Sequence, residues 1–392
     1  MRIGTQLWLL AVLSAIACDD AKSTQAGAVG TADGGEDASS ADAGAADAAS
    51  DQAPARADLD EMLDQGIAEF LGAAKPTGSE TIHDVAGVAD GSVVYDFDPA
   101  DGPVCMRGSP FHVSVLDQGS DNLMIFMQGG GACVSVLCSA TTEASPRGVP
   151  QLGVLDPTDP DNPVGGWNMV YVPYCDGSVF GGNNDYGNES DATGRRLHHG
   201  QRNFAAALDR ALEHFPHPKK VLLAGSSAGG WGTVYHRALV RTQYPDAELS
   251  VLNDSGIGFM VNSQLVVDEW GTQRYRPPSC EPCQMHQHMS EFVKYDLEHD
   301  PDIVVGDFSS WEDTVIQRFA LTDAAGFRTL LGDETAIPAQ AFPDRYKRFI
   351  IEGGQHTSLQ RGFHTTQIDG VTIADWLRMM VDRDPGWTEM MQ

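Results

Sequence analysis

Basic residues are scarce in this sequence. It has 25 lysines and arginines against 55 aspartates and glutamates, and its formal net charge at pH 7 is −30. Residues 59–392 keep −24 of that charge. A surface with this balance repels phosphate backbones and anionic membranes, so we expect no nucleic-acid partner and no electrostatic binding to a membrane.

The sequence also lacks an apolar run long enough to span a bilayer. The run from Leu7 to Ala17 is too short for that, and Arg2 precedes it. It ends at Leu13-Ser14-Ala15-Ile16-Ala17-Cys18, which looks like a bacterial lipobox. We therefore expect residues 1–18 to be an export signal cleaved before Cys18, whose thiol carries lipid at the cell envelope (outer membrane or cell surface). An ordinary signal peptide cleaved after Ala17, which releases a secreted protein, is the alternative.

Large apolar residues are nearly absent from residues 19–58, which are mostly Ala, Asp, Gly and Ser. Such a segment cannot bury enough surface to offset the entropy of ordering it, so it is predicted to be a disordered tether. Residues 59–392 contain no internal repeat and no second linker, and we expect them to form one catalytic domain. Membrane contact is then expected only through the N-terminal lipid, and the protein is expected to be a monomer.

Six cysteines remain when Cys18 is set aside, and an even number in an exported protein predicts disulfides. Six cysteines allow 15 pairings, and their spacing does not choose among them. Cys280-Glu-Pro-Cys283 also fits half a zinc site or a redox pair. No second CxxC accompanies it and the compartment is oxidising, so a small disulfide loop is favoured. We expect no metal.

Apolar runs alternate with helix-like stretches through the rest of the chain. The strand-like runs are 123–127, 167–172, 221–224, 249–252, 302–305 and 348–351, and the helix-like stretches are 204–215 and 230–244. This alternation predicts an α/β fold of the α/β-hydrolase type, with a mostly parallel central sheet covered by helices on both faces. In such sheets the chemistry is found beyond the carboxyl ends of the strands.

The pentapeptide Gly225-Ser226-Ser227-Ala228-Gly229 follows one of these strands directly and precedes a helix. A serine in a tight strand-to-helix turn is exposed and lies at a helix N-terminus, which favours developing negative charge. The pattern therefore predicts Ser227 as a nucleophile, and with it ester hydrolysis.

A serine hydroxyl needs a base and an orienting acid, and in this fold the chain order is Ser, then acid, then His. His356 follows the last strand and a Gly-Gly turn, so it is the predicted base, with His364 as its rival. The acid is either Asp313, after the later strand, or Asp254, and the placement favours Asp313. The remaining candidates, which we expect to be surface or packing residues, are His198, His199, His286 and His288.

An oxyanion hole also needs backbone N–H groups. Gln128-Gly129-Gly130-Gly131-Ala132 follows an early strand, where esterases of this fold place a glycine-rich oxyanion loop. The second donor is expected from Ala228, the residue after the nucleophile.

Four blocks together resemble the pectin acetylesterase/Notum family of serine carboxylesterases. They are QGGGAC (128–133), VPYCDGSVFGG (172–182), LLAGSSAGG (222–230) and LNDSG (252–256). The resemblance implies a triad of Ser227, Asp313 and His356 with an oxyanion hole from Gly130, Gly131 and Ala228. It also implies the disulfides Cys105–Cys175 and Cys133–Cys138, which leaves Cys280–Cys283. Where relatives have Trp after the paired glycines, this chain has Gly131, which could widen the mouth of the pocket.

The substrate expected from this resemblance is an O-acetyl or other short acyl ester on a polysaccharide, or a small ester, cleaved without a cofactor. Trp231 is expected to wall the acyl site, and Tyr174 and Asp176 to contact substrate. The alternatives are a Notum-type lipid or protein O-deacylase and a non-catalytic, surface glycan-binding lipoprotein. The acidity of the chain argues against polyanionic pectin unless its dense basic cluster lines the site; that cluster is Arg195, Arg196, His198, His199 and Arg202.

Overall fold

A computed structural model describes residues 57–257, 263–283 and 289–392. The predicted export signal (1–18), its lipid acceptor Cys18 and almost all of the predicted tether (19–58) lie outside these ranges. None of the helices within the described ranges has the length and apolarity needed to cross a bilayer.

A large, mostly parallel sheet forms the centre of the described chain. The strands are β1 (Pro76–Thr81), β2 (Val93–Phe97), β3 (His112–Leu116), β4 (Asn122–Met127), β5 (Gly131–Val134), β6 (Leu137–Ala140), β7 (Asn168–Val172), β8 (Asn184–Tyr186), β9 (Arg196–His198), β10 (Lys220–Ser226), β11 (Glu248–Asp254), β12 (Val304–Ser310), β13 (Tyr346–Ile351), β14 (Gln367–Ile368), β15 (Val371–Thr372) and β16 (Met390–Met391). The central sheet has the order β1-β2-β3-β7-β4-β10-β11-β12-β13-β16. From β7 to β16 its strands are parallel, while β1, β2 and β3 add an antiparallel edge. The predicted α/β fold is confirmed.

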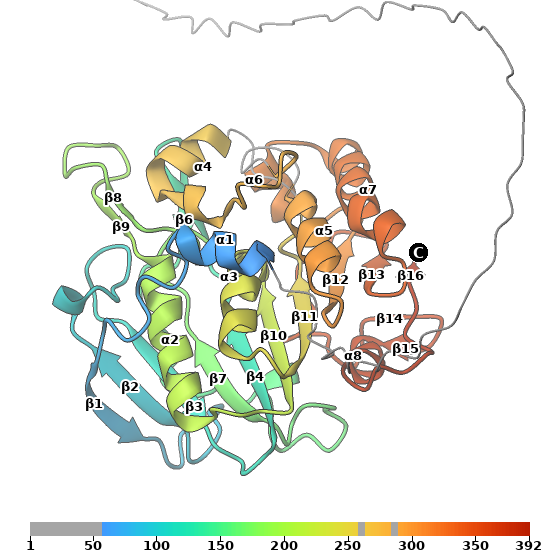
Figure 1. Ribbon diagram of the computed structural model, residues 1–392, viewed down its shortest axis with the longest axis horizontal. Coiled ribbons are helices and arrows are strands. Elements are labelled where there is room, and N and C mark those ends of the chain that lie inside the picture. The colour runs from blue at the N-terminus through green and yellow to red at the C-terminus, as the bar shows by residue number, and fades with distance from the viewer. Residues whose placement is uncertain (1–56, 258–262, 284–288) are drawn as a thin grey trace, which may run out of the picture. The chain divides into compact units, whose positions relative to one another are not determined.

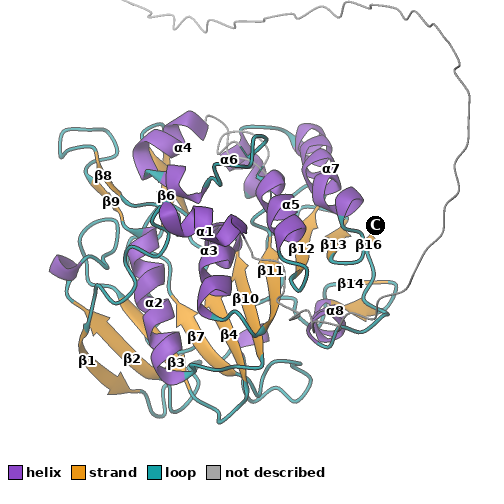
Figure 2. Ribbon diagram, viewed as in Figure 1, coloured by secondary structure: helices purple, strands orange, loops and turns teal. Residues whose placement is uncertain are grey.

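Helices pack on both faces of this sheet. They are α1 (Ala57–Asp64), α2 (Gly200–His214), α3 (Ala228–Gln243), α4 (Ser263–Trp270), α5 (Ser290–His299), α6 (Ile316–Ala320), α7 (Ala324–Ala341) and α8 (Ile373–Val381), with the short 3-10 helices η1 (Pro99–Asp101), η2 (Gly153–Leu155) and η3 (Thr272–Tyr275). In Figure 1, α2 and α3 lie in front of the sheet, and α4 and α6 lie beyond its upper end. The same view coloured by element type shows the strands running behind these helices (Figure 2).

The two faces of the sheet pack into two separate hydrophobic clusters. On β4, Ile125 belongs to a cluster with residues of α2, α3 and α5. Its neighbour Phe126 belongs to a second cluster with α8 and the loop 149–167. Because successive side chains of a strand point to opposite faces, a strand buried on both faces is apolar at every position. This explains why the central strands are continuous apolar runs rather than alternating ones.

Three disulfides are present in the described chain, with the pairing that the family resemblance implies. Cys105 bonds to Cys175 and Cys280 to Cys283. Cys133 bonds to Cys138 directly opposite it on the β5–β6 hairpin. Disulfides are typical of proteins that fold outside the reducing cytosol, so the chain is suited to an extracellular compartment.

One buried histidine on α3 makes the stability of the fold depend on pH. His236 on α3 is fully buried. Its ring stacks on Phe204 at 3.8 Å between centroids, and its Nε2 donates to the Phe180 carbonyl oxygen at 2.8 Å. Burial lowers the pKa of His236 to about 3. The folded chain therefore keeps this ring neutral at pH values where the unfolded chain protonates it.

Acid should weaken the fold through His236. Because its folded pKa lies below the unfolded value of about 6.5, its contribution to stability is complete above pH 6.5 and declines as the pH falls towards 3. Between pH 7 and pH 5 the unfolding free energy should lose about 2 kcal/mol from this group. The variant His236→Gln has no such group to titrate. The difference in unfolding free energy between the wild type and this variant should therefore be about 2 kcal/mol smaller at pH 5 than at pH 7.

Urea unfolding of both proteins at pH 7, 6 and 5 measures this difference. His217→Gln is the matched control, because His217 is exposed. A destabilisation by His236→Gln that is the same at pH 7 and pH 5 would contradict the assignment.

Candidate active site

Ser227 occupies a strained turn between a strand and a helix. β10 ends at Ser226 and α3 begins at Ala228, and Ser227 has φ 55° and ψ −117°. Residues other than glycine rarely adopt this conformation, which costs on the order of 1–3 kcal/mol and is concentrated at functional sites. The turn is tight, because a Cβ on Gly229 would lie 1.9 Å from the Met127 carbonyl oxygen. It presents Ser227 at the start of α3, where the first amides have no intrahelical partner.

Neighbouring parallel strands bring the other candidate residues to the same edge of the sheet. β4, β10, β11, β12 and β13 lie side by side and run in the same direction. Their carboxyl ends therefore meet. The residues at or just after these ends are Gln128, Ser227, Asp254, Asp313 and His356, in the order of the strands.

The imidazole of His356 is held by Asp313. Its Nδ1 lies 2.7 Å from Oδ2 of Asp313, which is fully buried. The other carboxylate oxygen accepts from the backbone N–H groups of Val315 and Ile316, each at 2.9 Å. With Nδ1 donating to the carboxylate, Nε2 is the nitrogen that can accept a proton. His356 and Ser227 line the same cleft.

Asp254, the other candidate acid, makes different contacts. Its carboxylate accepts from Ser226 Oγ at 2.5 Å and from the backbone N–H groups of Ser358 and Leu359 at 2.8 and 3.0 Å. Its own carbonyl oxygen accepts from the Ser227 N–H at 2.7 Å. Burial raises the pKa of Asp254 to about 6, against the opposing effect of these hydrogen bonds. Asp254 thus joins the serine turn to the loop behind His356, while Asp313 contacts the imidazole.

The other histidines lie elsewhere. His364 forms an ion pair with Asp159 at 2.6 Å. His198 is fully buried, with its Nδ1 against the Asp176 carbonyl oxygen, and His199 contacts Asp185. His286 and His288 lie outside the described residues.

The glycine-rich segment after β4 leads into the β5–β6 hairpin. Gly131 opens β5 opposite Ala140 with φ 84°, and a Cβ there would lie 1.9 Å from the Ser139 carbonyl oxygen. Only glycine fits this position of the hairpin. The Thr141 N–H donates to the Gly130 carbonyl oxygen at 2.8 Å. Gly130 and Gly131 both line the cleft in front of Ser227.

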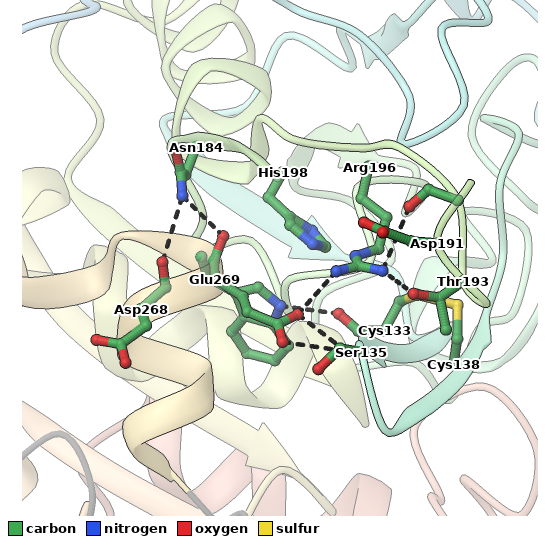
Figure 3. A network of polar contacts seen from close by, with 12 residues as sticks. Cys133, Ser135, Cys138, Asn184, Asp191, Thr193, Arg196, His198, Asp268 and Glu269 are labelled. Atoms are coloured by element: carbon green, nitrogen blue, oxygen red, sulfur yellow. Dashed lines mark hydrogen bonds and ion pairs between the residues drawn. A yellow bond between two sulfur atoms is a disulfide. The ribbon is translucent and has the colours of Figure 1, made fainter. Parts of the chain in front are cut away.

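A buried ion pair braces this hairpin from outside (Figure 3). Glu269, near the end of α4, accepts from the Ser135 N–H at the hairpin turn at 2.9 Å and from Arg196 Nη2 at 3.0 Å. The side chains of Glu269 and Arg196 are fully buried. The adjacent Trp270 donates from Nε1 to the Cys133 carbonyl oxygen at 2.9 Å. Together with the Cys133–Cys138 disulfide, these contacts hold the hairpin on both strands.

Ser227 opens onto a cleft of about 590 Å³, within the range of about 300–1,000 Å³ that is usual for ligand sites. Residues 129–131 form one wall and His356 lies on another. The remaining polar residues of the lining are uncharged: Gln128, Ser139, Thr141, Ser226, Thr357 and Gln360.

A second, small apolar pocket of about 20 Å³ adjoins the serine. Trp231 lines this pocket. It is the residue that we expected from the sequence to form a wall of the acyl site. Its other apolar side chains are Val179, Ile316 and Phe319. This small apolar space beside the serine suits a small apolar group.

Tyr174 and Asp176 do not contact the cleft, which corrects the expectation that they bind substrate. Both are fully buried. The Tyr174 hydroxyl oxygen accepts from the Val179 N–H at 3.0 Å, and its ring packs against Gly130. Asp176 accepts from the Ser178 N–H at 2.8 Å and from the Ser178 hydroxyl. The Tyr174 hydroxyl and Oδ1 of Asp176 thus bond to their own loop, while Oδ2 of Asp176 is buried without a hydrogen-bond partner among the described residues.

Sequence reasoning missed two groups of residues at this site. Ile316 and Phe319 lie three residues apart on α6, directly after Asp313, and the pattern Val-Ile-Gln-Arg-Phe could have pointed to an apolar helix face over the site. Glu269 and Arg196 are 73 positions apart, and no local pattern connects them.

Comparison with known proteins adds independent information. The family described as pectinacetylesterase matches residues 91–292. Pectin acetylesterase 4 of Arabidopsis thaliana is 32% identical over 172 residues, which cover 40% of this chain and 41% of that protein. Pectin acetylesterase 11 of the same plant is 26% identical over 244 residues, or 54% of this chain and 61% of that protein.

Human palmitoleoyl-protein carboxylesterase NOTUM is 29% identical over 179 residues, which cover 41% of this chain and 35% of that protein. The chain thus spans between about a third and three fifths of the length of these relatives. The family match includes Ser227 and the glycine-rich loop but ends before β12. Asp313 and His356 are therefore placed by geometry alone.

The Glu269–Arg196 pair should be essential for stability. Removing one partner of a buried ion pair leaves the other charge uncompensated and costs about 3–5 kcal/mol. Glu269→Gln keeps the shape of the side chain but leaves Arg196 charged and buried. We expect the unfolding free energy from urea titration to fall by about 3–5 kcal/mol.

Arg195→Gln is the matched control. Arg195 is the neighbour of Arg196, and its ion pair with Asp185 is about half exposed, with side-chain exposures of 54% and 47%. Exposed pairs contribute about 0–1 kcal/mol, so this variant should lose no more than that. Equal losses in the two variants would show that the buried pair has no special role.

Proposed function

Because this chain belongs to the pectinacetylesterase family, we propose that it hydrolyses carboxylic esters through an acyl-enzyme on Ser227. The observation that carries the proposal is the cleft that Ser227 and His356 share, with Asp313 bound to the far nitrogen of the imidazole. A strained serine, an oriented imidazole and a buried carboxylate are the parts that nucleophilic acyl transfer needs.

In the first half of the reaction Ser227 Oγ attacks the ester carbonyl carbon, and its proton passes to His356 Nε2. The carbonyl oxygen becomes an oxyanion, which the N–H groups of Gly130, Gly131 and Ala228 stabilise. Asp313 stabilises the imidazolium through Nδ1. When the bond from carbon to the alcohol oxygen breaks, His356 returns the proton to the leaving alcohol.

In the second half a water molecule takes the place of the alcohol. His356 accepts one of its protons as the water oxygen attacks the acyl-enzyme, and then protonates Ser227 Oγ as the acid product leaves. Ser227 supplies the covalent bond, His356 transfers the protons, and the backbone amides and Asp313 stabilise the charges that form. The sum is ester plus water giving acid plus alcohol.

The pocket beside Ser227 favours a short acyl group. A volume of about 20 Å³ between Trp231, Val179, Ile316 and Phe319 accepts the methyl group of an acetyl ester. A long acyl chain, such as the one in the name of NOTUM, would require these side chains to move apart. This supports an acetylesterase over a deacylase of long chains. The cleft shared by Ser227 and His356, with Asp313 on the imidazole, supports an enzyme over a non-catalytic glycan-binding protein.

We place this activity outside the cell. The apolar run before Cys18 and the lipobox-like Leu13–Cys18 support export and a lipid anchor at the envelope, with the acidic tether holding the enzyme away from the membrane. Disulfides in the described chain are compatible with that location.

Hydrolysis of p-nitrophenyl acetate by single variants tests the assignment of the triad. Ser227→Ala should lower kcat by about 10⁶, and Asp313→Asn by about 10⁴ because the imidazole loses its orientation. A fluorophosphonate probe should label the wild-type protein at Ser227 and leave Ser227→Ala unlabelled. Retention of wild-type turnover by Ser227→Ala would refute the mechanism.

Asp254→Asn is the matched control for Asp313→Asn, since both replace a buried carboxylate by an amide. Its effect on kcat should be smaller by at least about tenfold, because Asp254 does not contact the imidazole. If Asp254→Asn were the more damaging of two folded variants, Asp254 would be the acid of the triad.

The acyl pocket predicts a steep dependence on chain length. Across p-nitrophenyl acetate, butyrate and octanoate, kcat/KM should fall, since each methylene that a pocket rejects changes discrimination by about 10–200-fold. Phe319→Ala should raise the butyrate-to-acetate ratio of kcat/KM by at least about tenfold. A wild-type preference for octanoate would contradict a short acyl site.

A further inference from the structure

The cleft outside the acyl pocket offers hydrogen bonds without charge. Gln128 and Gln360 provide amide groups, and Ser139, Thr141 and Thr357 provide hydroxyls. The Gln128 amide oxygen is already used, because it accepts from the Tyr174 N–H at 2.9 Å. Uncharged donors and acceptors of this kind match the hydroxyl groups of a sugar, each of which both donates and accepts.

Cations are missing from the cleft lining among the described residues. The two internal stretches outside the description, 258–262 and 284–288, contain no lysine or arginine in the sequence. Carboxylates on a substrate are usually recognised by arginine or lysine, because their desolvation is otherwise uncompensated. A polyuronate chain would therefore find no ion-pair partner in this cleft.

The basic cluster that could have supplied such partners is already engaged. Arg196 is fully buried against Glu269 (Figure 3). Arg195 and His199 both contact Asp185, at 2.9 and 2.8 Å. His198 is buried, and burial lowers its pKa to about 3, so it is neutral at pH 7.

The last member of the cluster, Arg202, donates from Nε to Asn183 Oδ1 at 2.9 Å and lies over the Phe70 ring. Arg107, beside the Cys133–Cys138 hairpin, donates to the Arg195 carbonyl oxygen at 2.6 Å. Neither lines the cleft. The cluster thus places no cation in the cleft lining, and the net charge of the chain repels a polyanion at low ionic strength.

From these contacts we propose that the alcohol part of the substrate is a neutral glycan, so that the enzyme removes acetyl groups from uncharged polysaccharide chains in preference to polyuronates. This inference rests on the proposed esterase function and concerns the leaving-group side of the same site.

Two acetylated polymers test it at a matched content of acetyl groups: acetylated xylan, which is neutral, and acetylated polygalacturonate. Acetate release should give a kcat/KM at least about tenfold higher on the xylan at 20 mM salt, and the ratio should shrink at 300 mM salt because the repulsion is screened. Equal or higher kcat/KM on polygalacturonate at 20 mM salt would overturn the proposal.

Gln360→Lys provides a second test at the same site. One lysine about 4 Å from a substrate carboxylate in water should raise the ratio of kcat/KM on acetylated polygalacturonate to kcat/KM on p-nitrophenyl acetate roughly fivefold, because the lysine affects the imidazolium equally with both substrates. This gain should disappear at high salt. Gln360→Met, which has a similar length and no charge, is the matched control and should show no such gain. The same gain in both variants would overturn the electrostatic explanation.

Hydrolysis of p-nitrophenyl acetate separates this inference from the function on which it rests. A protein that does not cleave this neutral ester lacks the proposed activity altogether. A protein that cleaves it, but releases acetate from neither polymer, is an esterase whose substrate is not a neutral glycan.

Discussion

One buried carboxylate, that of Asp254, joins the two sides of the candidate active site. Asp254 accepts hydrogen bonds from Ser226 on the nucleophile side and from Ser358 and Leu359 on the histidine side. The two sides follow strands β10 and β13, which are not neighbours in the sheet, so Asp254 links segments that no strand pairing joins. Burial makes its charge costly, as the raised pKa of about 6 shows, and the three hydrogen bonds offset that cost.

Glu269 has the corresponding role on the oxyanion side. Its carboxylate joins the turn of the β5–β6 hairpin to Arg196 on β9, and both charges are fully buried. A buried ion pair often stabilises a fold no more than apolar side chains of the same volume would. It does restrict the backbone, because any movement that separates the two charges leaves each of them buried and unpaired. We infer that this pair is retained for geometry: a shift of the hairpin would displace the Gly131 amide from the oxyanion.

The parts of this site that could be predicted from the sequence are those set by local patterns. Continuous apolar strands predict the parallel sheet, and the strand-glycine-helix pattern around Ser227 predicts the turn. The choice between Asp313 and Asp254 depended on which carboxylate reaches the imidazole, since both follow suitable strands. Tyr174 and Asp176 were expected to contact substrate, but both are fully buried and line no part of the cleft, and their burial leaves no local pattern in the sequence. Contacts as distant in sequence as Glu269 with Arg196 leave no local pattern.

The uncharged cleft is also what the proposed chemistry requires. The reaction creates a positive imidazolium at His356, and Asp313 is the buried anion that stabilises it. A lysine or arginine placed in the cleft to bind uronates would oppose this transient charge by about 1 kcal/mol at 4 Å in water, and by more where water is excluded. A site that binds hydroxyl groups through Gln128, Thr141 and Gln360 avoids this conflict. Recognition of a neutral glycan and stabilisation of the imidazolium therefore favour the same lining.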